Sequence, residues 1–294
     1  MTEASYRTLE VPAIRRERLS DRGHDRWSPD LLRGHLKLAL RPLTPLHVGG
    51  PVPVPAQELG FKGITGLVRP FYRQGRRLVV PGSSLKGALR SLVEMFTYSC
   101  PVTDESKRCR GPAYCLACRV FGALGWQGQW FFSDGLIRRA EGQKVLRRRI
   151  LRLPPQRLGH ARANEDIRRY YPHRPFAMAE EDEYLVEALG PERVVVHTEV
   201  HFYNLRPEEL GAVLIALGQG KPPLCLKLGG GKNAGLGTMQ VHVTASTIWQ
   251  GAEQVDKPLT DYVAQAQHSE VIDQGALTQL QADLGCPSSE TGER

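Results

Sequence analysis

Long apolar runs are missing from this chain. None of its 294 residues belongs to a run of eighteen or more apolar residues, which is about the length that a transmembrane helix needs. The first 34 residues are polar and charged and contain no apolar segment of the kind found in secretory signal peptides. These absences exclude the membrane-spanning class and predict a cytoplasmic protein.

Cysteines are few and unevenly distributed. The chain has six, of which four lie within nineteen residues, and Cys225 and Cys286 stand apart. Because reducing compartments disfavour disulfides, we expect none here. Cys225 lies between Leu224 and Leu226 and is expected to be a packing residue of the core.

The cysteine cluster has the spacing of a metal site. Its pattern is C-x8-C-x5-C-x2-C, formed by Cys100, Cys109, Cys115 and Cys118. Only the last pair has the usual spacing of a zinc knuckle, but four thiolates complete a closed tetrahedral shell. A small insertion with few apolar residues needs a bound metal or a similar cross-link to hold it folded. The pattern therefore predicts a structural zinc ion; the alternative is a set of unliganded thiols.

Positive charge is concentrated in one segment. The net charge is +8, and residues 138–174 alone carry eleven arginines and one lysine against three acids, a net +9. A concentrated basic segment attracts phosphate, and arginine also stacks on bases. Arg147, Arg148 and Arg149 are the candidate contacts, and Tyr170–Arg174 interleaves aromatic and basic residues. The alternative is a solvated charged loop.

Hydrophobic periodicity predicts an α+β fold. Strand, helix, strand is followed by the same series again, which is typical of a ferredoxin-like or RRM-like core with long insertions. We expect an arm at 1–34, a core domain at 35–245 and a polar tail at 246–294 with a loose helix. The expected elements are strands at 35–40, 130–137, 193–203 and 238–245, a hairpin at 71–80, helices at 83–96 and 208–217, a cysteine insertion at about 98–120, and a basic insertion at about 138–190.

Two segments have the composition of phosphate-binding elements. Pro81–Arg90 places Ser83, Ser84, Lys86 and Arg90 at the start of a helix capped by one of the serines, where backbone N–H groups bind anions. The alternative is a capped amphipathic helix whose cations are solvated.

The second segment, 229–237, is rich in glycine and includes Gly230, Gly231, Lys232 and Asn233. It is not a P-loop, because Asn233 stands where Ser or Thr is needed. Its N–H groups could still clamp a polynucleotide backbone; the alternative is a flexible hairpin turn.

A third pattern lies on the expected strand at 193–203. His197, Glu199 and His201 alternate and share one face. They could bind a metal, or they could simply form the polar side of a half-buried strand.

Several short motifs, taken in order, resemble a known family. They are Leu43–Gly50, Pro81–Arg90, Arg119–Gly122, Phe132–Asp134, Asn204–Gly211 and Gly229–Gly237. This series is similar to the RAMP superfamily, in particular to backbone-type subunits of type III CRISPR effector complexes. The resemblance implies an RRM-like core that contacts a CRISPR RNA (crRNA), its target RNA and other effector subunits. It also implies that the glycine segment and the helix after Pro81 face the guide backbone, with the basic segment as a thumb-like insertion.

One departure from the family concerns cleavage. RNA-cleaving members carry an aspartate in the loop that here spans 51–80, but this loop has none, and Glu58 is its only acid. Ile64–Gly66 occupies the matching position, and Asp134 is interpreted as part of a structural corner. We therefore expect an RNA-binding subunit that does not cleave. The alternatives are a target-RNA endoribonuclease using Glu58 and a crRNA-processing endoribonuclease using His47.

Overall fold

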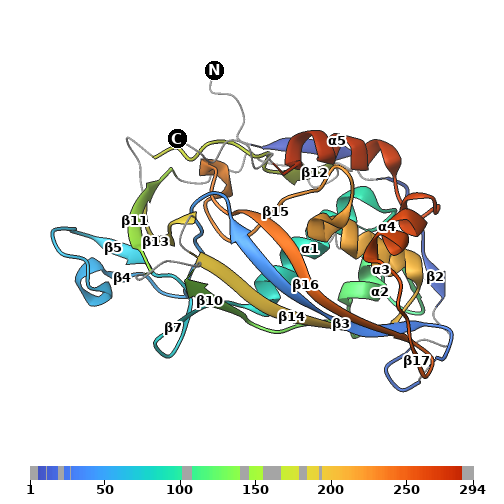
Figure 1. Ribbon diagram of the computed structural model, residues 1–294. Coiled ribbons are helices and arrows are strands. Elements are labelled where there is room, and N and C mark those ends of the chain that lie inside the picture. Colours follow the sequence, from blue (N-terminus) through green and yellow to red (C-terminus); the bar gives the residue numbers. More distant parts are fainter. Residues whose placement is uncertain are drawn as a thin grey trace.

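A strongly curved β-sheet forms the centre of the molecule (Figure 1). The computed structural model describes residues 6–10, 12–18, 23–26, 28–100, 108–139, 146–154, 167–178, 184–191 and 194–286. Much of the predicted basic insertion and the last eight residues lie outside these ranges. No described helix has the length and apolar character needed to cross a bilayer.

Four antiparallel strands make the core of this sheet, in the order β16-β3-β14-β10. They are β3 (Leu32–Pro42), β10 (Gly135–Arg139), β14 (Val194–Leu205) and β16 (Thr238–Gln250). Along β14 buried residues alternate with more exposed ones, as expected for a strand with one face against the core. The predicted strands are therefore present, with 130–137 divided into two.

Shorter strands extend the sheet at both edges and along β14. They are β6 (Arg73–Gln74), β7 (Arg77–Val80), β9 (Trp130–Phe132), β15 (Leu226–Lys227) and β17 (Glu253–Gln254). Strands β6 and β7 form the predicted hairpin at 71–80.

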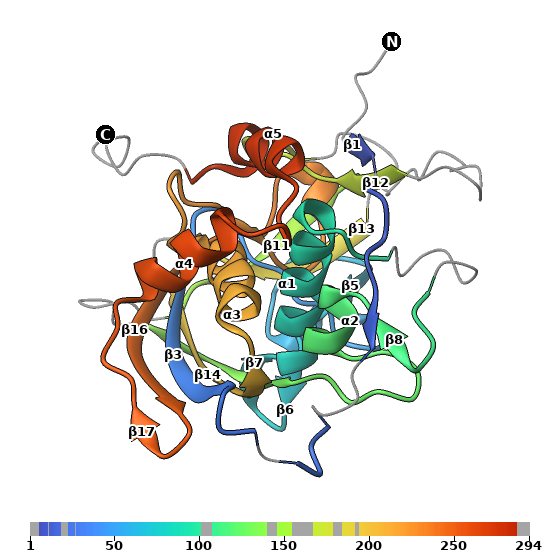
Figure 2. The ribbon, with the colours of Figure 1, turned by 90° about the vertical axis from the view of Figure 1, so that its right-hand side faces the viewer.

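Helices cover one side of the sheet (Figure 2). They are α1 (Gly82–Phe96), α2 (Leu116–Phe121), α3 (Pro207–Leu214), the π-helical turn η3 (Ile215–Gln219), α4 (Leu259–Gln267) and α5 (Gln274–Leu284). The predicted apolar stripe of α1 is fully buried against them and the sheet: Leu85, Leu89, Leu92, Val93 and Phe96.

The start of α1 differs from the prediction. Its N-cap is Pro81, and neither Ser83 nor Ser84 caps the helix. Instead the carboxylate of Asp134 accepts a 2.7 Å hydrogen bond from the Gly82 N–H. The prediction missed this cap because it comes from the corner between β9 and β10, 52 residues further along the chain. The serine hydroxyls are thereby left for other contacts.

The segment after β16 differs from the expected polar tail with a loose helix. Helix α4 packs closely on α3, where Gly211 lies against the carbonyl of Tyr262, and Tyr262, Val263 and Ala266 are buried. Helix α5 buries Leu277 and Leu280. The polar composition hid two amphipathic helices with short apolar stripes.

Cys225 and Cys286 form a disulfide, with their Cα atoms 4.8 Å apart. The expectation that these two cysteines stand alone is therefore wrong. The chain after α5 runs beside Cys225, since the Cys225 N–H donates to Leu284 O at 2.8 Å and the Cys286 N–H donates to Pro223 O at 2.9 Å. Cys225 is also fully buried, as predicted.

Three small sheets lie at the periphery. One has the order β11-β13-β5-β4, formed by β4 (Val54–Pro55), β5 (Leu67–Arg69), β11 (Arg148–Leu153) and β13 (Tyr184–Leu189). The others pair β1 (Arg7–Glu10) with β12 (Ile167–Tyr170) and β2 (Glu17–Arg18) with β8 (Ala113–Tyr114). The N-terminal arm thus contributes one strand to each pair.

Candidate functional site

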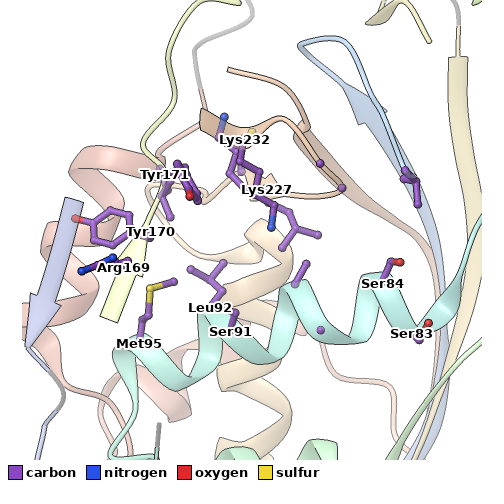
Figure 3. Close-up of a pocket in the computed structure, with 18 of the residues that line it drawn as sticks. Ser83, Ser84, Ser91, Leu92, Met95, Arg169, Tyr170, Tyr171, Lys227 and Lys232 are labelled. Atoms are coloured by element: carbon purple, nitrogen blue, oxygen red, sulfur yellow. The ribbon is translucent and has the colours of Figure 1, made fainter. Parts of the chain in front are cut away.

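A cavity of about 450 Å³ lies between α1 and the glycine segment (Figure 3). On one side are α1 residues spaced three and four apart, including Ser84, Ser91 and Met95. On the other side lie Lys227, Gly229, Gly230 and Lys232, and Figure 3 shows the two lysines across the cavity from α1. The two predicted phosphate-binding elements therefore face each other.

The lining of the cavity is basic and rich in hydroxyls. Arg169, Lys227 and Lys232 contribute to it, together with serine and tyrosine hydroxyl side chains, and none of the described lining residues is acidic. Burial, aided by the charges of Lys232 and Arg174, lowers the pKa of Lys227 to about 8. Burial also lowers the pKa of Lys232. Two partly desolvated cations with no carboxylate beside them in the cavity favour an anionic ligand.

The glycines allow their loop to approach the backbone around His47. Gly229 has φ +85°, and a Cβ there would lie 2.1 Å from the His47 carbonyl oxygen. The Gly230 N–H donates to that same oxygen at 2.8 Å. The loop continues through the short helical turn η4 (Lys232–Ala234). Only glycine fits this close contact, so the glycine segment and the motif Leu43–Gly50 form one unit.

His47 is buried within this unit. Its Nδ1 lies 2.7 Å from the Glu187 carbonyl oxygen, a contact in which the ring nitrogen donates. Burial lowers the pKa of His47, so the ring is neutral at pH 7. These contacts give His47 a structural part in holding β13 beside the loop.

The structure divides the predicted RNA contacts into two groups. Ser83, Ser84, Gly230 and Lys232 line the cavity. The others do not: Lys86, Arg90, Gly231, Asn233, Arg147, Arg148 and Arg149. Lys86 and Arg90 do share one face of α1, as predicted, but it is not the face of Ser84 and Ser91. Asn233 donates to the Pro154 carbonyl at 3.3 Å, and Gly231 packs against Leu153 and Leu236.

Arg90 is occupied by internal contacts. Its guanidinium donates to Glu94 at 2.7 Å, to the Gly122 carbonyl at 2.6 Å and to the Cys118 Sγ at 3.4 Å. Arg168 pairs with the other oxygen of Glu94 at 2.5 Å. These contacts give Arg90 a structural role beside the cysteine cluster, and its contact with RNA stays a prediction.

The four clustered cysteines come together as predicted. Cys100, Cys109, Cys115 and Cys118 are all buried, and their Sγ atoms lie within 4.8 Å of one another. The Sγ of Cys100 is 3.4 Å from that of Cys118 and 3.7 Å from that of Cys115. A tetrahedral ion with metal–sulfur bonds of about 2.3 Å separates its sulfurs by about 3.8 Å, so the set fits a metal ion.

Hydrogen bonds favour the thiolate form at two of the four sulfurs, those of Cys109 and Cys115. Backbone N–H groups of Cys100 and Cys115 donate to the Sγ atoms of Cys115 and Cys109 at 3.4 and 3.3 Å. The hydrogen bond with Cys100 lowers the pKa of Cys115 to about 6 and that of Cys109 as well, whereas hydrogen bonds with the neighbouring thiols raise the pKa of Cys100 and Cys118. Such donors stabilise the deprotonated form that binds a metal.

A second basic cavity is lined by residues of the neighbouring strands β6, β7 and β10, here called the β7–β10 edge, and by Arg148 of β11. Its volume is about 670 Å³, and its lining includes five arginines: Arg73, Arg76, Arg77, Arg138 and Arg148. Arg148 and Arg73 both bind the buried carboxylate of Glu187, at 2.9 and 2.6 Å. Burial alone raises the pKa of Glu187. The hydrogen bonds from Arg73, the Phe71 N–H and Arg148 outweigh burial and hold that pKa below its usual value. Arg147 and Arg149 are exposed on the neighbouring β11 edge.

Glu58 stands away from the cavity between α1 and the glycine segment. It is exposed in the short helix η1 (Ala56–Leu59), on the projection formed by β4 and β5 (Figure 1). It lines neither basic cavity. The loop at Ile64–Gly66 lies on the same projection.

Sequence reasoning missed Lys227 and Arg169 as lining residues, whereas Tyr171 belongs to the segment Tyr170–Arg174 that it singled out. Lys227 had a detectable signal, since it is a single cation between Leu226 and Leu228 in an otherwise apolar segment. Arg169 had no such signal, because its position depends on β12 pairing with the distant β1.

Two family motifs are joined by a buried ion pair. Arg119, from the Arg119–Gly122 motif, pairs with Glu209, from the Asn204–Gly211 motif, at 2.7 Å, and both side chains are buried. Glu209 also accepts a hydrogen bond from the Arg206 N–H at the start of α3. The motifs that suggested a family from the sequence are therefore in contact in the fold.

The fold is α+β, and its basic cavity is bordered by a glycine loop and a helix start, with no acidic residue among the described lining residues. The chain matches the RAMP superfamily over residues 39–240, more than half its length, and it belongs to that superfamily. The superfamily is associated with CRISPR effector complexes and with RNA binding. No curated protein matches the sequence significantly.

Proposed function

We propose that this chain is an RNA-binding subunit of a type III CRISPR effector complex, which holds the crRNA and its duplex with target RNA. The observation that carries the proposal is the cavity in which the glycine loop and α1 face each other with Lys227 and Lys232 between them. Family membership supports RNA as the anionic ligand.

In this proposal the guide backbone crosses the mouth of the cavity. Ser83 and Ser84 offer their hydroxyl groups as hydrogen-bond donors from the first turn of α1, where the Asp134 carboxylate already accepts from the Gly82 N–H. Lys227 and Lys232 supply charge from the opposite side, and Tyr171 offers a ring on which a base can stack. Partial burial strengthens each of these contacts.

The second basic cavity is suited to the other strand of the duplex. Arg76, Arg77 and Arg138 line it, with Arg147 and Arg149 on the adjacent strand. Arginine forks bind phosphate oxygens in pairs. The predicted thumb-like role of the basic segment is therefore carried, among described residues, by β11 and the β7–β10 edge.

Binding without cleavage is part of the proposal. Glu58 is exposed on a projection that lines neither basic cavity, and His47 is buried and neutral. In-line attack by a ribose hydroxyl needs an acid, a base or a metal at the scissile phosphate. The complex should therefore leave labelled complementary RNA intact opposite this subunit in Mg²⁺. Cuts that map to this subunit and disappear in the Glu58→Ala variant would contradict the proposal that this subunit binds RNA without cleaving it.

We also propose that the ion held by Cys100, Cys109, Cys115 and Cys118 is zinc with a structural role. Four buried thiolates close the coordination shell and leave no position for a substrate. The strand order β16-β3-β14-β10 supports the ferredoxin-like core that the sequence predicts.

Photo-crosslinking tests where RNA is bound. The full-length chain is irradiated with a labelled single-stranded RNA, and the cross-linked peptides are identified by mass spectrometry. We expect adducts at Tyr170–Tyr171 and within 224–237. Adducts confined to the outer face of the sheet would contradict the proposal.

A further inference from the structure

The outer face of the central sheet carries a cluster of metal-binding side chains. His35 on β3 and His201 on β14 are direct partners in the antiparallel register. Glu199 lies two residues before His201, so it projects from the same face. This face is opposite to the one that packs on α1 and α3, where Val200 and Phe202 are buried.

The three side chains converge. Glu199 Oε1 lies 3.9 Å from the Nε2 of His35 and 3.7 Å from the Nε2 of His201. One ligand atom from each residue lies within 4.8 Å of the other two. Bonds of about 2.0–2.2 Å to zinc bring nitrogen and oxygen ligands to about 3–3.5 Å from one another. Small rotations of the exposed His201 and the half-buried His35 and Glu199 side chains close that difference.

The same arrangement leaves one side of the cluster open. His35 and His201 also line a cavity of about 450 Å³ with Phe131, Tyr203 and Trp249. The His35 ring lies 5.7 Å from that of His201 and 6.0 Å from that of Trp249. Neighbouring packing therefore limits the imidazole orientations, which favours a defined site.

We propose that His35, Glu199 and His201 bind one divalent transition-metal ion of the zinc class. Two imidazoles and one carboxylate supply three ligands, and the remaining positions face the aromatic cavity and solvent. Lys37 lies directly opposite Glu199 in the strand register, so this site is weaker than the four-cysteine site.

The proposal does not depend on RNA binding. The cluster lies on the sheet, and its residues do not line the cavity between α1 and the glycine segment. It also differs from the cysteine site in ligand chemistry, since it has no sulfur. This difference makes the two sites separable by spectroscopy.

The test loads the full-length protein with one equivalent of Zn²⁺ to fill the cysteine site and then titrates it with Co²⁺. We expect a second equivalent to bind with weak d–d absorption in the visible range and without the intense near-ultraviolet band of cobalt–thiolate bonds. His35→Ala, His201→Ala and the near-isosteric Glu199→Gln should each weaken this second binding by more than the roughly 10–100-fold that loss of an outer-shell partner costs.

His197→Ala is the matched control. His197 is an exposed histidine on the same face of β14 and lies outside the cluster, so its removal should leave the second equivalent in place. The proposal is overturned if wild-type protein binds no second equivalent or if the three variants retain it. Equal weakening in His197→Ala would also overturn it.

Discussion

The fold alters the chemistry of Lys227 by lowering its pKa to about 8. Lys227 sits between buried leucines on β15, and its ammonium group faces the cavity together with Lys232. Burial removes water from the lysine ammonium group, and this desolvation costs free energy. An anionic ligand offsets that cost, because a phosphate restores the interactions that water provides.

RNA affinity should therefore depend on pH in a specific direction. Since the pKa of Lys227 is lowered to about 8, its charge is present at pH 7 and is lost as the pH rises toward 9. Affinity should fall over this interval at constant ionic strength, as measured by fluorescence anisotropy. Lys227→Arg, which stays charged, should flatten the profile. An equally steep profile in Lys227→Arg would show that another group is responsible.

Gly229 provides a test of backbone fit. Its φ of +85° and the 2.1 Å approach of a Cβ to the His47 carbonyl predict that Gly229→Ala lowers the unfolding free energy by more than the roughly 1–2 kcal/mol of left-handed strain alone. Gly63→Ala is the control, because Gly63 has φ +75° with nothing within 4 Å of a Cβ. Urea unfolding measures both. Equal destabilisation by the two substitutions would contradict the close approach at Gly229.

At the scale of elements, polar links join the helices to one another and to the sheet. The Arg119–Glu209 pair connects α2 to α3, and Glu17 of β2 extends it to Arg206 at the start of α3. The Asp134 carboxylate connects the β9–β10 corner to α1. The Arg119–Glu209 link accounts for one buried charged residue in each of two family motifs, whereas Asp134 forms its link from an exposed corner.

Removing one partner of the Arg119–Glu209 pair should be strongly destabilising. Arg119→Met removes the close counterion of the buried Glu209 carboxylate, which costs about 3–5 kcal/mol, and Glu209→Leu leaves Arg119 only its longer contact with Glu17. The double variant Arg119→Met, Glu209→Leu should be destabilised by less than the sum of the two single effects, as measured by denaturant unfolding. Additive effects would show that the two side chains are not coupled.

The cysteine insertion should depend on its metal. Elemental analysis of undamaged protein should find about one zinc for the four thiolates. Cys118→Ser should release that zinc and lower the unfolding temperature, because α2 and the ends of the insertion are held together through the sulfurs. Less than about half an equivalent of metal in the wild-type protein would contradict the site.

Local patterns predicted the elements better than they predicted their partners. The stripe of α1, the alternation of β14 and the four clustered thiols follow from spacing along one segment, and each is present in the structure. The Asp134 cap, the internal bonds of Arg90 and the Cys225–Cys286 disulfide depend on interactions between distant segments. No single segment carries that information, so sequence reasoning assigned Arg90 to RNA and left Cys286 alone.

At the scale of the whole molecule, the fold separates three surfaces. One cavity lies between α1 and the glycine loop, a second carries five arginines at the β7–β10 edge, and the outer face of the sheet carries the histidines. The disulfide ties the end of α5 to the strand that carries Lys227. The C-terminal helices, which composition alone suggested were peripheral, therefore support the candidate site.

The salt dependence of RNA binding tests the central claim most directly. The affinity for one single-stranded RNA is measured for three full-length proteins. They are the wild type, the double variant Lys227→Ala, Lys232→Ala, and the control Lys221→Ala, Lys257→Ala, which removes two exposed lysines. Each phosphate that a variant no longer neutralises should reduce the slope of log K against log salt by about 0.7. For the cavity variant, with its two lysines removed, we predict weaker binding and a slope that is about 1.4 lower, with the control unchanged; equal slopes for all three proteins would contradict the account.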